Sequence, residues 1–379
     1  MSKPILVMMG GASAEHEVSV VTGLQALERL DRSAYVPHVI FVAKSGEPFL
    51  LPGLRDRTGF SRARRVPVSF GLDGRGGFVR TAGWLGKIIR PYAALLAFHG
   101  GLGESGPAQG LLESVEIPFT SASVEGSVVA MNKQLTKLVA RDAGIPTVPG
   151  VSLFAEDIRA NVSAAAEHAL ASLSLPVIVK PSHFGSSIGI HVAKTRVELE
   201  KHLMEASFMD SEAIVESYLD PRTELNCAVR RVNGKVQASE IERPMSRDEI
   251  LSFADKYQRG GKKTGGSMAS LDRELPAKIN PATREAIQAM AKRAFLACRC
   301  KGMVRIDFIL DRNGDAYLNE VNPIPGSLAF YLWEATGVSY TEQLTALIEQ
   351  AVRDADGLRE KRLDYASDII EKFAATGRQ

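Results

Sequence analysis

The segment from residue 304 to residue 322 limits the fold of this chain more narrowly than any other part of the sequence. It consists of two alternating apolar and polar runs on either side of Asn313-Gly314. An Asn-Gly dipeptide between two such runs is the strongest short-range signal of a β-hairpin. If the chain turns there, the predicted cross-strand pairs are Arg312 with Asp315, Asp307 with Glu320, and Arg305 with Asn322.

The last two of these pairs should share one polar face, because residues two apart on a strand point the same way. Carboxylates that lie directly opposite each other repel unless a cation lies between them. The carboxylates of Asp307 and Glu320, with the amide oxygen of Asn322, are hard oxygen ligands of the kind that bind Mg²⁺ alongside phosphates. Ile306 and Phe308 should point the other way, toward a core. The alternative is an ordinary surface hairpin whose polar face is solvated.

Length and composition are those of an ordinary globular protein. The 379 residues suffice for two or three domains. The chain is 45% hydrophobic and 24% charged, and its net charge of +2 gives no strong attraction for nucleic acid or an anionic membrane. Three cysteines, an odd and sparse set, indicate a reducing compartment. No apolar run approaches the roughly 20 residues that span a bilayer. We therefore expect a cytoplasmic protein without nucleic-acid partners or membrane insertion.

The N-terminal part alternates apolar strands with a helix. We expect strands at 4–9, 36–42 and 93–98, a helix capped by Ser13 that runs to Leu30, and mostly loop over 53–86. The strand, helix, strand order predicts a parallel α/β unit, in which ligands bind beyond the carboxyl ends of the strands.

Two further units follow, beginning near residues 122 and 217. The expected helices are 127–143, 281–299 and 340–354, and the expected strands are 176–181, 190–192, 213–219, a group within 223–243, and the hairpin. The charged residues 356–379 are expected to form a helical tail.

A second cluster of polar signals surrounds Lys180, which ends an apolar strand and precedes the loop Gly185–Gly189. The backbone N–H groups of a Gly- and Ser-rich loop can bind a phosphate, and a neighbouring lysine adds a positive charge. Lys133 lies on the helix predicted before this strand. Each signal alone is also typical of a plain turn or a solvated lysine. Together with the acidic hairpin they indicate a nucleoside triphosphate site.

Several motifs together resemble the ATP-grasp superfamily, and within it the D-alanine–D-alanine ligases. In chain order the motifs are GGASAEHEVS, FHGGLGESGPAQGLLE, MNKQLTK, VKPSHFGSSIGI, VESYL, DKY and RIDF…NEVNPIPG. The resemblance runs from Ile5 to Leu347. It implies an N-terminal α/β domain (1–121), the small lid part of an ATP-grasp fold (122–216), its C-terminal part with the metal hairpin (217–355), and the tail (356–379).

The resemblance also implies roles for matching residues. The residues implied in catalysis are Glu15, Ser186, Tyr257, Arg305 and Gly326, of which Glu15 would bind the ammonium of the first D-alanine, and Arg305 with the N–H of Gly326 would stabilise the oxyanion. Those implied for the second substrate are Lys256, Ser327, Leu328 and His99, the last either helping to deprotonate the amine or purely structural. Those implied for ATP are Lys133, Lys180, Ser187, Glu216, Ser217, Leu219 and Glu224. Those implied for Mg²⁺ or Mn²⁺ are Asp307, Glu320 and Asn322.

The implied activity is ATP-dependent joining of two D-alanines through a D-alanyl phosphate, which supplies the dipeptide for peptidoglycan. A homodimer is also implied. Because water would destroy the acylphosphate, the loops 185–189 and 255–270 are expected to close over it.

The sequence departs from the family pattern beside the second-substrate site. Asn322-Pro323-Ile324-Pro325-Gly326 runs directly into Ser327-Leu328, where the family has additional residues. Asn132 and Ser105 replace acids. Two alternatives therefore stay open: an ATP-grasp ligase with a different amino acid acceptor, and an ATP-binding protein without catalysis. A dinucleotide-dependent oxidoreductase is disfavoured, because the turn at Gly10-Gly11 lacks the third glycine of that fingerprint.

Overall fold

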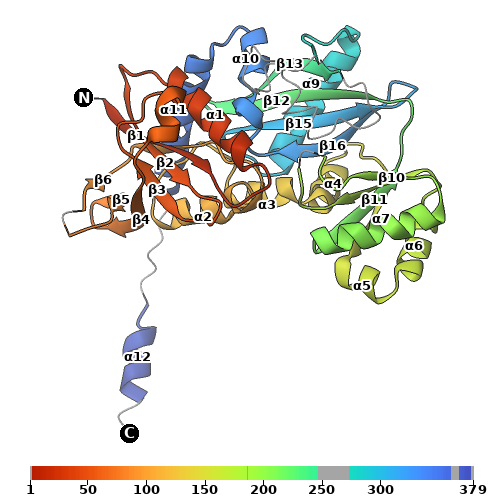
Figure 1. The fold of residues 1–379 in the computed structure, drawn as a ribbon, viewed down its shortest axis with the longest axis horizontal. Helices are drawn as coiled ribbons and strands as arrows, with labels where there is room; N and C mark the ends of the chain where they lie inside the picture. Colours follow the sequence, from red (N-terminus) through yellow and green to blue (C-terminus); the bar gives the residue numbers. More distant parts are fainter. Residues whose placement is uncertain (1, 85, 186, 246–272, 360–366, 377–379) are drawn as a thin grey trace.

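The computed structural model describes residues 2–84, 86–185, 187–245, 273–359 and 367–376, and its strands form three sheets (Figure 1). The strands of the three sheets come in turn from residues 3–96, 150–217 and 223–322. This mixed α/β architecture confirms the predicted fold class. The domain boundaries at 121, 216 and 355 stay a prediction.

The first sheet has seven strands in the order β6-β5-β4-β3-β2-β1-β7, and it is parallel only where β1 pairs with β2 and β7. Its strands are β1 (Lys3–Gly10), β2 (Tyr35–Val42), β3 (Pro48–Leu51), β4 (Val66–Asp73), β5 (Gly76–Thr81), β6 (Ile88–Ile89) and β7 (Ala93–Leu96). Helix α1 (His16–Arg29) packs on β1, which is buried along most of its length. The predicted strands 4–9, 36–42 and 93–98 are thus confirmed.

Two expectations for this part are wrong. The stretch 53–86 contains the turn η1 (Arg57–Arg62) and the β4–β5 hairpin, which lies at the partly exposed side of the sheet and therefore lacks a continuous apolar run. Ser13 does not cap α1, because Glu15 holds the N-cap position. The Ser13 hydroxyl instead donates to the carbonyl of His99 at 2.6 Å and accepts from the N–H of Glu15 at 3.2 Å. Ser13 thereby connects the start of α1 to the end of the β7 segment.

The second sheet has four strands in the order β10-β9-β11-β8. They are β8 (Gly150–Phe154), β9 (Val177–Pro181), β10 (His191–Ala193) and β11 (Glu212–Ser217). Helices α5 (Ala155–Ala160), α6 (Val162–Leu170) and α7 (Arg196–Met209) pack together against this sheet and form the lobe at the lower right of Figure 1.

The third sheet has five strands in the order β14-β13-β12-β15-β16 and is antiparallel throughout. They are β12 (Thr223–Val232), β13 (Lys235–Pro244), β14 (Arg273–Glu274), β15 (Met303–Leu310) and β16 (Ala316–Asn322). Helix α9 (Pro281–Ala297) packs on this sheet, as does α10 (Phe330–Ala335), and α11 (Tyr340–Arg359) contacts both β12 of this sheet and β7 of the first. Ile306 and Phe308 are buried in the core under α9, as expected.

The helix predicted over 127–143 is two helices, α3 (Val124–Met131) and α4 (Lys133–Asp142), because Asn132 is in an extended conformation between them. The Asn132 side chain caps α4 by accepting from the N–H of Leu135 at 2.8 Å. The apolar spacing of the sequence continues across this break. The break therefore cannot be predicted from that spacing. The break turns the first residues of α4 toward the second sheet.

The remaining described elements outside the C-terminal region are two short 3₁₀ turns, η2 (Gly101–Gly103) and η4 (Gly326–Ala329), and helix α2 (Pro107–Ser114). In the C-terminal region α11 extends beyond the predicted 340–354, and α12 (Ile369–Thr376) lies apart from the body in Figure 1. Among the helices described, none combines the length and the apolar character needed to cross a bilayer.

Gly302 provides a test of how tightly the first and third sheets are joined. Its φ is +60°, and an added Cβ would lie 2.2 Å from the carbonyl oxygen of Thr120. Gly337 has a φ of +88° but nothing within 4 Å of the Cβ position. Gly337→Ala should therefore lower the free energy of unfolding only by the left-handed penalty of about 1–2 kcal/mol. Gly302→Ala should lower it by about 1–3 kcal/mol more, because the backbone near Thr120 must also move. Urea denaturation measures both, and equal losses would contradict the close packing.

Candidate active site

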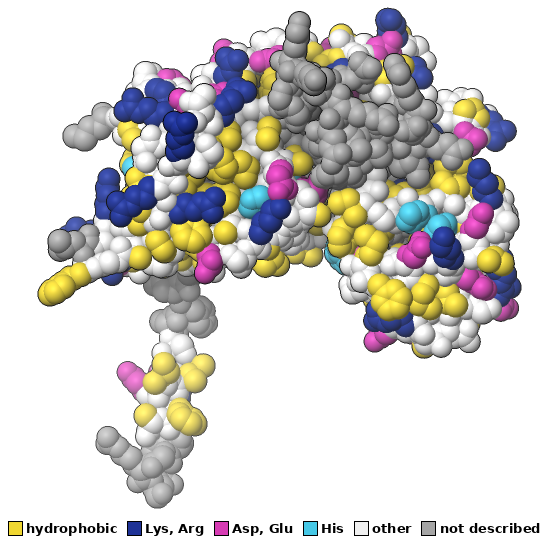
Figure 2. Space-filling model, viewed as in Figure 1, with side chains coloured by type: hydrophobic (Ala, Val, Ile, Leu, Met, Phe, Trp, Pro, Cys, Tyr) yellow, Lys and Arg dark blue, Asp and Glu magenta, His cyan; other side chains and the backbone are white. Residues whose placement is uncertain are grey.

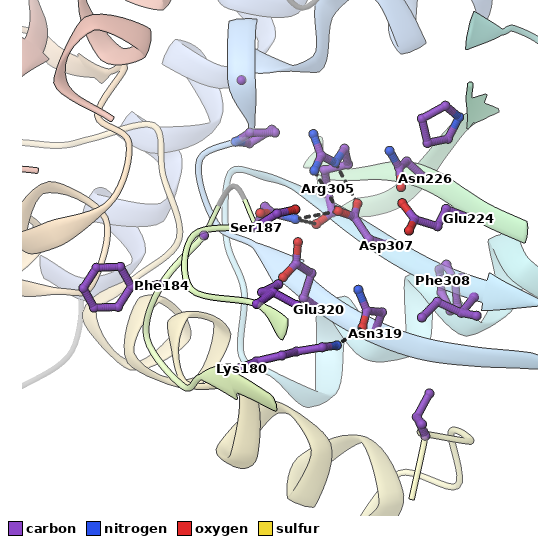
Figure 3. A pocket seen from close by; sticks show the side chains of 18 of the residues that line it. Lys180, Phe184, Ser187, Glu224, Asn226, Arg305, Asp307, Phe308, Asn319 and Glu320 are labelled. Carbon is purple, nitrogen blue, oxygen red and sulfur yellow. Dashed lines mark hydrogen bonds and ion pairs between the residues drawn. The ribbon is translucent and has the colours of Figure 1, made fainter. Parts of the chain in front are cut away.

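A large cavity lies where the three sheets meet. Its walls come from the N-terminal end of α1, the turn after β7, the end of β9 with the loop that follows, the segment 216–224 that connects the second sheet to the third, and the β15–β16 hairpin. Figure 3 shows the hairpin side chains Asp307 and Glu320 pointing into the same space, with Lys180 below them.

The hairpin register confirms that Asp307 lies opposite Glu320 and that Arg305 lies opposite Asn322. The expected pair of Arg312 with Asp315 is wrong. The register shifts beyond Asp307, so that Phe308 pairs with Leu318 and Asn319 is left as an extra residue. A bulge of this kind re-aims the side chains next to it. Here it places Asn319 and Glu320, two neighbouring residues, on the cavity wall together.

Arg305 and Asp307 form a buried bidentate ion pair. The Nε and Nη2 atoms of Arg305 donate to Oδ1 and Oδ2 of Asp307, both at 2.7 Å, and Asn322 Nδ2 donates to the same Oδ2 at 3.1 Å. Although burial alone would lower it, the charge of Asp307 raises the pKa of Arg305 well above its ordinary value. With exposed fractions of 8% for Arg305 and 9% for Asp307, the alternative of a merely solvated polar face is wrong.

The donor set of the hairpin fits a hard divalent cation. Asp307, Glu320 and Asn322 offer two carboxylates and an amide oxygen to one cavity, which matches the ligand preference of Mg²⁺ and Mn²⁺. Both oxygens of Asp307 accept from Arg305, and Asn322 turns its NH₂ group toward Asp307. Each oxygen of Asp307 keeps a further lone pair for a cation while it accepts from Arg305, so only the amide of Asn322 would have to rotate to offer its oxygen.

A buried carboxylate holds two lysines beside this hairpin. Glu216, at the end of β11, contacts the ammonium of Lys137 from α4 through Oε1 and accepts from Lys180 of β9 through Oε2 at 2.7 Å. Lys180 also donates to Asn319 at 3.0 Å, which fixes its ammonium against the hairpin. Burial acts to raise the pKa of Glu216, but the charges of Lys137 and Lys180 outweigh it and lower that pKa to about 2.

Lys133, the first residue of α4, points into the same region. Its ammonium donates to the carbonyl of Phe184 at 2.5 Å and lies 3.8 Å from Glu320. Its own N–H donates to the carbonyl of Ser182 at 3.1 Å. Burial lowers the pKa of Lys133. A negatively charged group placed beside it would raise this pKa again.

The other end of the cavity is an apolar slot between the second and third sheets. Its walls are the side chains of Met131, Val148, Ile178, Phe308 and Ile309. Ser217, Leu219 and Glu224, predicted for ATP, line its edge, and Arg222 Nε lies 3.6 Å from Glu224. Apolar walls beside a segment of irregular backbone and a carboxylate suit a purine and a ribose.

Three residues from the loops at the end of the first sheet form the wall nearest α1. Glu15, His99 and Glu104 all line the cavity and are buried. His99 Nε2 lies 2.9 Å from the hydroxyl of Thr22, and burial lowers the pKa of His99 to about 3. Its imidazole is therefore neutral at physiological pH and a weak base, which favours the structural alternative for this residue.

Glu104 was not anticipated. Its two oxygens accept from the N–H groups of Gly100 at 2.7 Å and Ile324 at 3.0 Å. Burial, together with the nearby charge of Glu15, raises the pKa of Glu104 to about 8. This carboxyl joins the turn after β7 to the segment that follows β16.

Ser327 and Leu328 do not line the cavity, unlike Gly326. The N–H of Ser327 donates to the hydroxyl of Thr22 at 3.0 Å, and both side chains are buried. Ser327, Leu328 and Ala329 all have positive φ, between +45° and +53°. The shortened segment is thus a compact left-handed turn packed on α1. The structure does not bring these two predicted residues together with the rest of the site.

Ser187 lies on the cavity wall, whereas Ser186, Lys256, Tyr257 and the predicted closing loop 255–270 lie outside the described residues. Sequence reasoning did not assign a role to Lys137, Glu104 or Asn319. The helical spacing of Lys133 and Lys137 was the one available signal for Lys137. Nothing local marked the other two, because one depends on burial and the other on a bulge.

Two models of one family cover most of the chain, the D-ala D-ala ligase N-terminus over residues 4–122 and the D-ala D-ala ligase C-terminus over residues 139–349. The chain belongs to the D-alanine–D-alanine ligase family. This membership confirms the resemblance and the prediction of an enzyme, and the oxidoreductase alternative is wrong.

Individual relatives of this ligase cover nearly its whole length. A D-alanine–D-alanine ligase of Thermosipho africanus is 32% identical over 91% of this chain and 92% of the relative. D-alanine–D-alanine ligase A of Chromobacterium violaceum is 35% identical over 91% of this chain and 94% of the relative. Among solved structures, the VanG D-Ala:D-Ser ligase of Enterococcus faecalis aligns with a TM-score of 0.78 at 26% identity, covering 93% of this chain and 100% of that one. The ligase of Helicobacter pylori aligns with a TM-score of 0.69 at 28% identity, covering 92% and 98%.

Replacing Glu216 tests whether its charge holds the two lysines. Glu216→Gln leaves the ammonium groups of Lys137 and Lys180 buried without a counter-charge. We expect the free energy of unfolding to fall by about 3–5 kcal/mol, as when one partner of a buried ion pair is removed. Glu200→Gln, which removes an i,i+4 surface pair with Arg196, is the matched control and should change it by less than about 1 kcal/mol. Chemical denaturation at neutral pH measures both, and similar losses would show that the pair contributes no more than a surface contact.

The raised pKa of Glu104 predicts a pH dependence of stability. A carboxyl whose pKa rises from its ordinary 4.5 to about 8 on folding binds more protons in the folded state between these values. The free energy of unfolding should therefore fall as pH rises through this window, by up to about 1.4 kcal/mol per pH unit from this group. Glu104→Gln should remove that slope in urea denaturation between pH 6.5 and 8, above the range in which the lowered pKa of His99 gives a slope of the opposite sign. Glu15→Gln should move the upper end of the window below 8, since Glu15 helps to raise this pKa. A wild-type slope retained in Glu104→Gln would assign it to another group.

Proposed function

We propose that this ligase joins two molecules of D-alanine at the expense of ATP, through a D-alanyl phosphate, and so supplies the dipeptide for peptidoglycan. The observation that carries the proposal is the cavity in which the facing carboxylates of Asp307 and Glu320 lie beside Arg305 and Lys180. Phosphoryl transfer requires little more than positioned phosphates and charges that offset the developing negative charge. The named relatives supply the choice of D-alanine.

The lysines provide the cationic part of the site. Lys180 is held in place by Glu216 and Asn319, and Lys133 by the carbonyl of Phe184. We assign both to oxygens of the transferred phosphate chain. Since each lysine has its direction fixed before the nucleotide binds, little reorganisation is needed when the charge develops.

The hairpin residues divide between a cation and the reacting carbonyl. Asp307, Glu320 and Asn322 would hold Mg²⁺ or Mn²⁺, which when bound neutralises phosphate oxygens. We assign Arg305 and the N–H of Gly326 to the oxyanion formed when the second amine adds to the acylphosphate. Arg305 donates two of its five N–H groups to Asp307, and the others remain for this role.

The N-terminal wall binds and orients the amino acids. Glu15 faces the cavity next to Gly185, where an ammonium group of the first D-alanine would meet its carboxylate. His99 is too weak a base to deprotonate the second amine, given its pKa of about 3. We assign it the positioning of the 324–327 segment through Thr22, whose hydroxyl contacts both His99 and Ser327.

A molecule other than D-alanine is a distinct candidate for the second substrate, which is the acceptor. Ser327 is turned away from the cavity, and a structural neighbour is a D-Ala:D-Ser ligase. Incubation of the full chain with ATP, Mg²⁺ and D-alanine, alone or with D-serine or D-lactate, should release phosphate and give mainly the D-alanine dipeptide by mass spectrometry. If the main product instead joined D-alanine to D-serine or D-lactate, that molecule would replace D-alanine as the proposed acceptor. Absence of phosphate release with every amino acid would support the ATP-binding alternative without catalysis.

The proposed role of the Arg305 charge can be tested against a control arginine on the same hairpin. Arg305→Met should lower kcat by about 10²–10³-fold, the usual effect of removing one oxyanion donor. Arg312→Met removes an exposed arginine at the turn of that hairpin and should leave kcat within about twofold. Steady-state phosphate release measures both variants. A KM increase without a change in kcat would place Arg305 in substrate binding alone.

We also infer that the enzyme works in the cytoplasm as a homodimer. The cytoplasmic location is supported by the small-molecule substrates and by three buried cysteines without disulfides, Cys227, Cys298 and Cys300. The homodimer is supported by the family resemblance. Light scattering of the purified chain tests the dimer.

A further inference from the structure

Two histidines and a glutamate gather on the second sheet, away from the cavity. His191 begins the edge strand β10, and His202 and Glu205 lie on α7, which packs against it. The Nδ1 atom of His202 lies 2.9 Å from Oε2 of Glu205, and Nε2 of His191 lies 3.9 Å from the same oxygen. One ligand atom from each residue lies within 4.8 Å of the other two.

We propose that His191, His202 and Glu205 form a binding site for a transition-metal ion of the zinc class. Two imidazole nitrogens and a carboxylate oxygen are a ligand set of zinc sites, and imidazole favours such ions over Mg²⁺. A tetrahedral shell at roughly 2.0–2.2 Å separates neighbouring ligand atoms by roughly 3.3–3.5 Å. The two separations from Glu205 Oε2, 2.9 Å and 3.9 Å, lie on either side of that value. Small shifts of these atoms, together with rotation of one imidazole ring, would therefore close the shell, with water in the fourth position.

The side chains have the freedom that this adjustment needs. The rings of His191 and His202 are stacked, with centroids 4.6 Å apart and an angle of 8° between their planes. Because a nitrogen lone pair lies in the plane of its ring, one ring must turn before both can face a single ion. His191 can do so, since its side chain is 46% exposed at a sheet edge, while His202, at 14%, is held by the packing of α7. Figure 2 shows histidine side chains at the surface of this lobe beside acidic and basic side chains.

The cluster contains one negative group, and one positive side chain lies beside it. The carboxylate of Glu205 is the negative group, and its pKa is lowered chiefly by the hydrogen bond from His202. Lys201 Nζ lies 3.9 Å from Oε1, the other oxygen of this carboxylate, and so leaves Oε2 for the ion. When the ion binds Nδ1 of His202, the ring proton moves to Nε2.

The position of the site gives it a consequence for the enzyme. Ile190 lines the cavity, and His191 is the next residue, at the end of the segment that follows the Gly185–Gly189 loop. An ion bound at the cluster would fasten the start of β10 to α7. It would thereby restrain the downstream end of the loop that is predicted to cover the phosphates.

Zinc titration of the full chain tests this site. With excess Mg²⁺ present to occupy the cavity, isothermal titration calorimetry should show Zn²⁺ binding that weakens by about tenfold or more in His202→Ala and in Glu205→Gln. His168→Ala removes an exposed histidine from α6 of the same lobe and should leave the affinity within about twofold. Hydrogen exchange adds a second readout, in which Zn²⁺ should slow exchange at residues 191–193 of the wild type but not of His191→Ala.

A substitution in the cavity separates this site from the predicted Mg²⁺ ligands. Asp307→Asn combined with Glu320→Gln should retain the Zn²⁺ binding and lose phosphate release. Loss of Zn²⁺ binding in this double variant, or unchanged binding in His202→Ala, would overturn the proposal. In either case the function proposed for the cavity would stand unaffected, because its test is phosphate release with Mg²⁺.

Discussion

The ion pairs between Glu216 and the lysines Lys137 and Lys180 are the interaction on which the candidate site depends. They join α4, β9 and β11, and through Asn319 they reach the hairpin of the third sheet. Burial removes the hydration of all three charged groups, which is unfavourable for each group alone. Their mutual attraction offsets this cost. The arrangement keeps a fixed positive charge beside the facing carboxylates. A site that must bind a polyanion can therefore be charged in advance without destabilising the fold.

The same principle explains the pairing of Arg305 with Asp307. Before any ligand binds, each neutralises the other, and the buried hairpin carries no unpaired charge at that point. The pairing also fixes the direction of the guanidinium and of the carboxylate before any ligand binds. Because a carboxylate oxygen has two lone pairs and a guanidinium five N–H groups, both keep capacity for the ligands proposed above.

Much of the fold and part of the site could be predicted from the sequence. The alternation around Asn313-Gly314 predicted which residues of the hairpin face each other near Asp307, because register and face follow from a period of two. It failed closer to the turn, since a bulge at Asn319 leaves no mark in the apolar pattern. The break between α3 and α4 at Asn132 was also not predicted, because the apolar spacing of the sequence continues across it. Glu104 could not be found, because its raised pKa arises from burial beside Glu15, residues far apart in the sequence.

The shortened segment after Asn322 shows how a deletion can act at a distance from the residues it removes. With fewer residues, the chain passes directly from Gly326 into a left-handed turn, and the N–H of Ser327 is used by Thr22 of α1. Left-handed backbone at three successive residues with side chains is unfavourable and persists only where packing enforces it. Here α1, His99 and Gln343 of α11 supply that packing, the last by donating to the carbonyl of Leu328 at 2.8 Å. The cavity is consequently bounded here by Pro325 and Gly326, whereas Ser327 and Leu328 are held in the packing against α1 and do not line it.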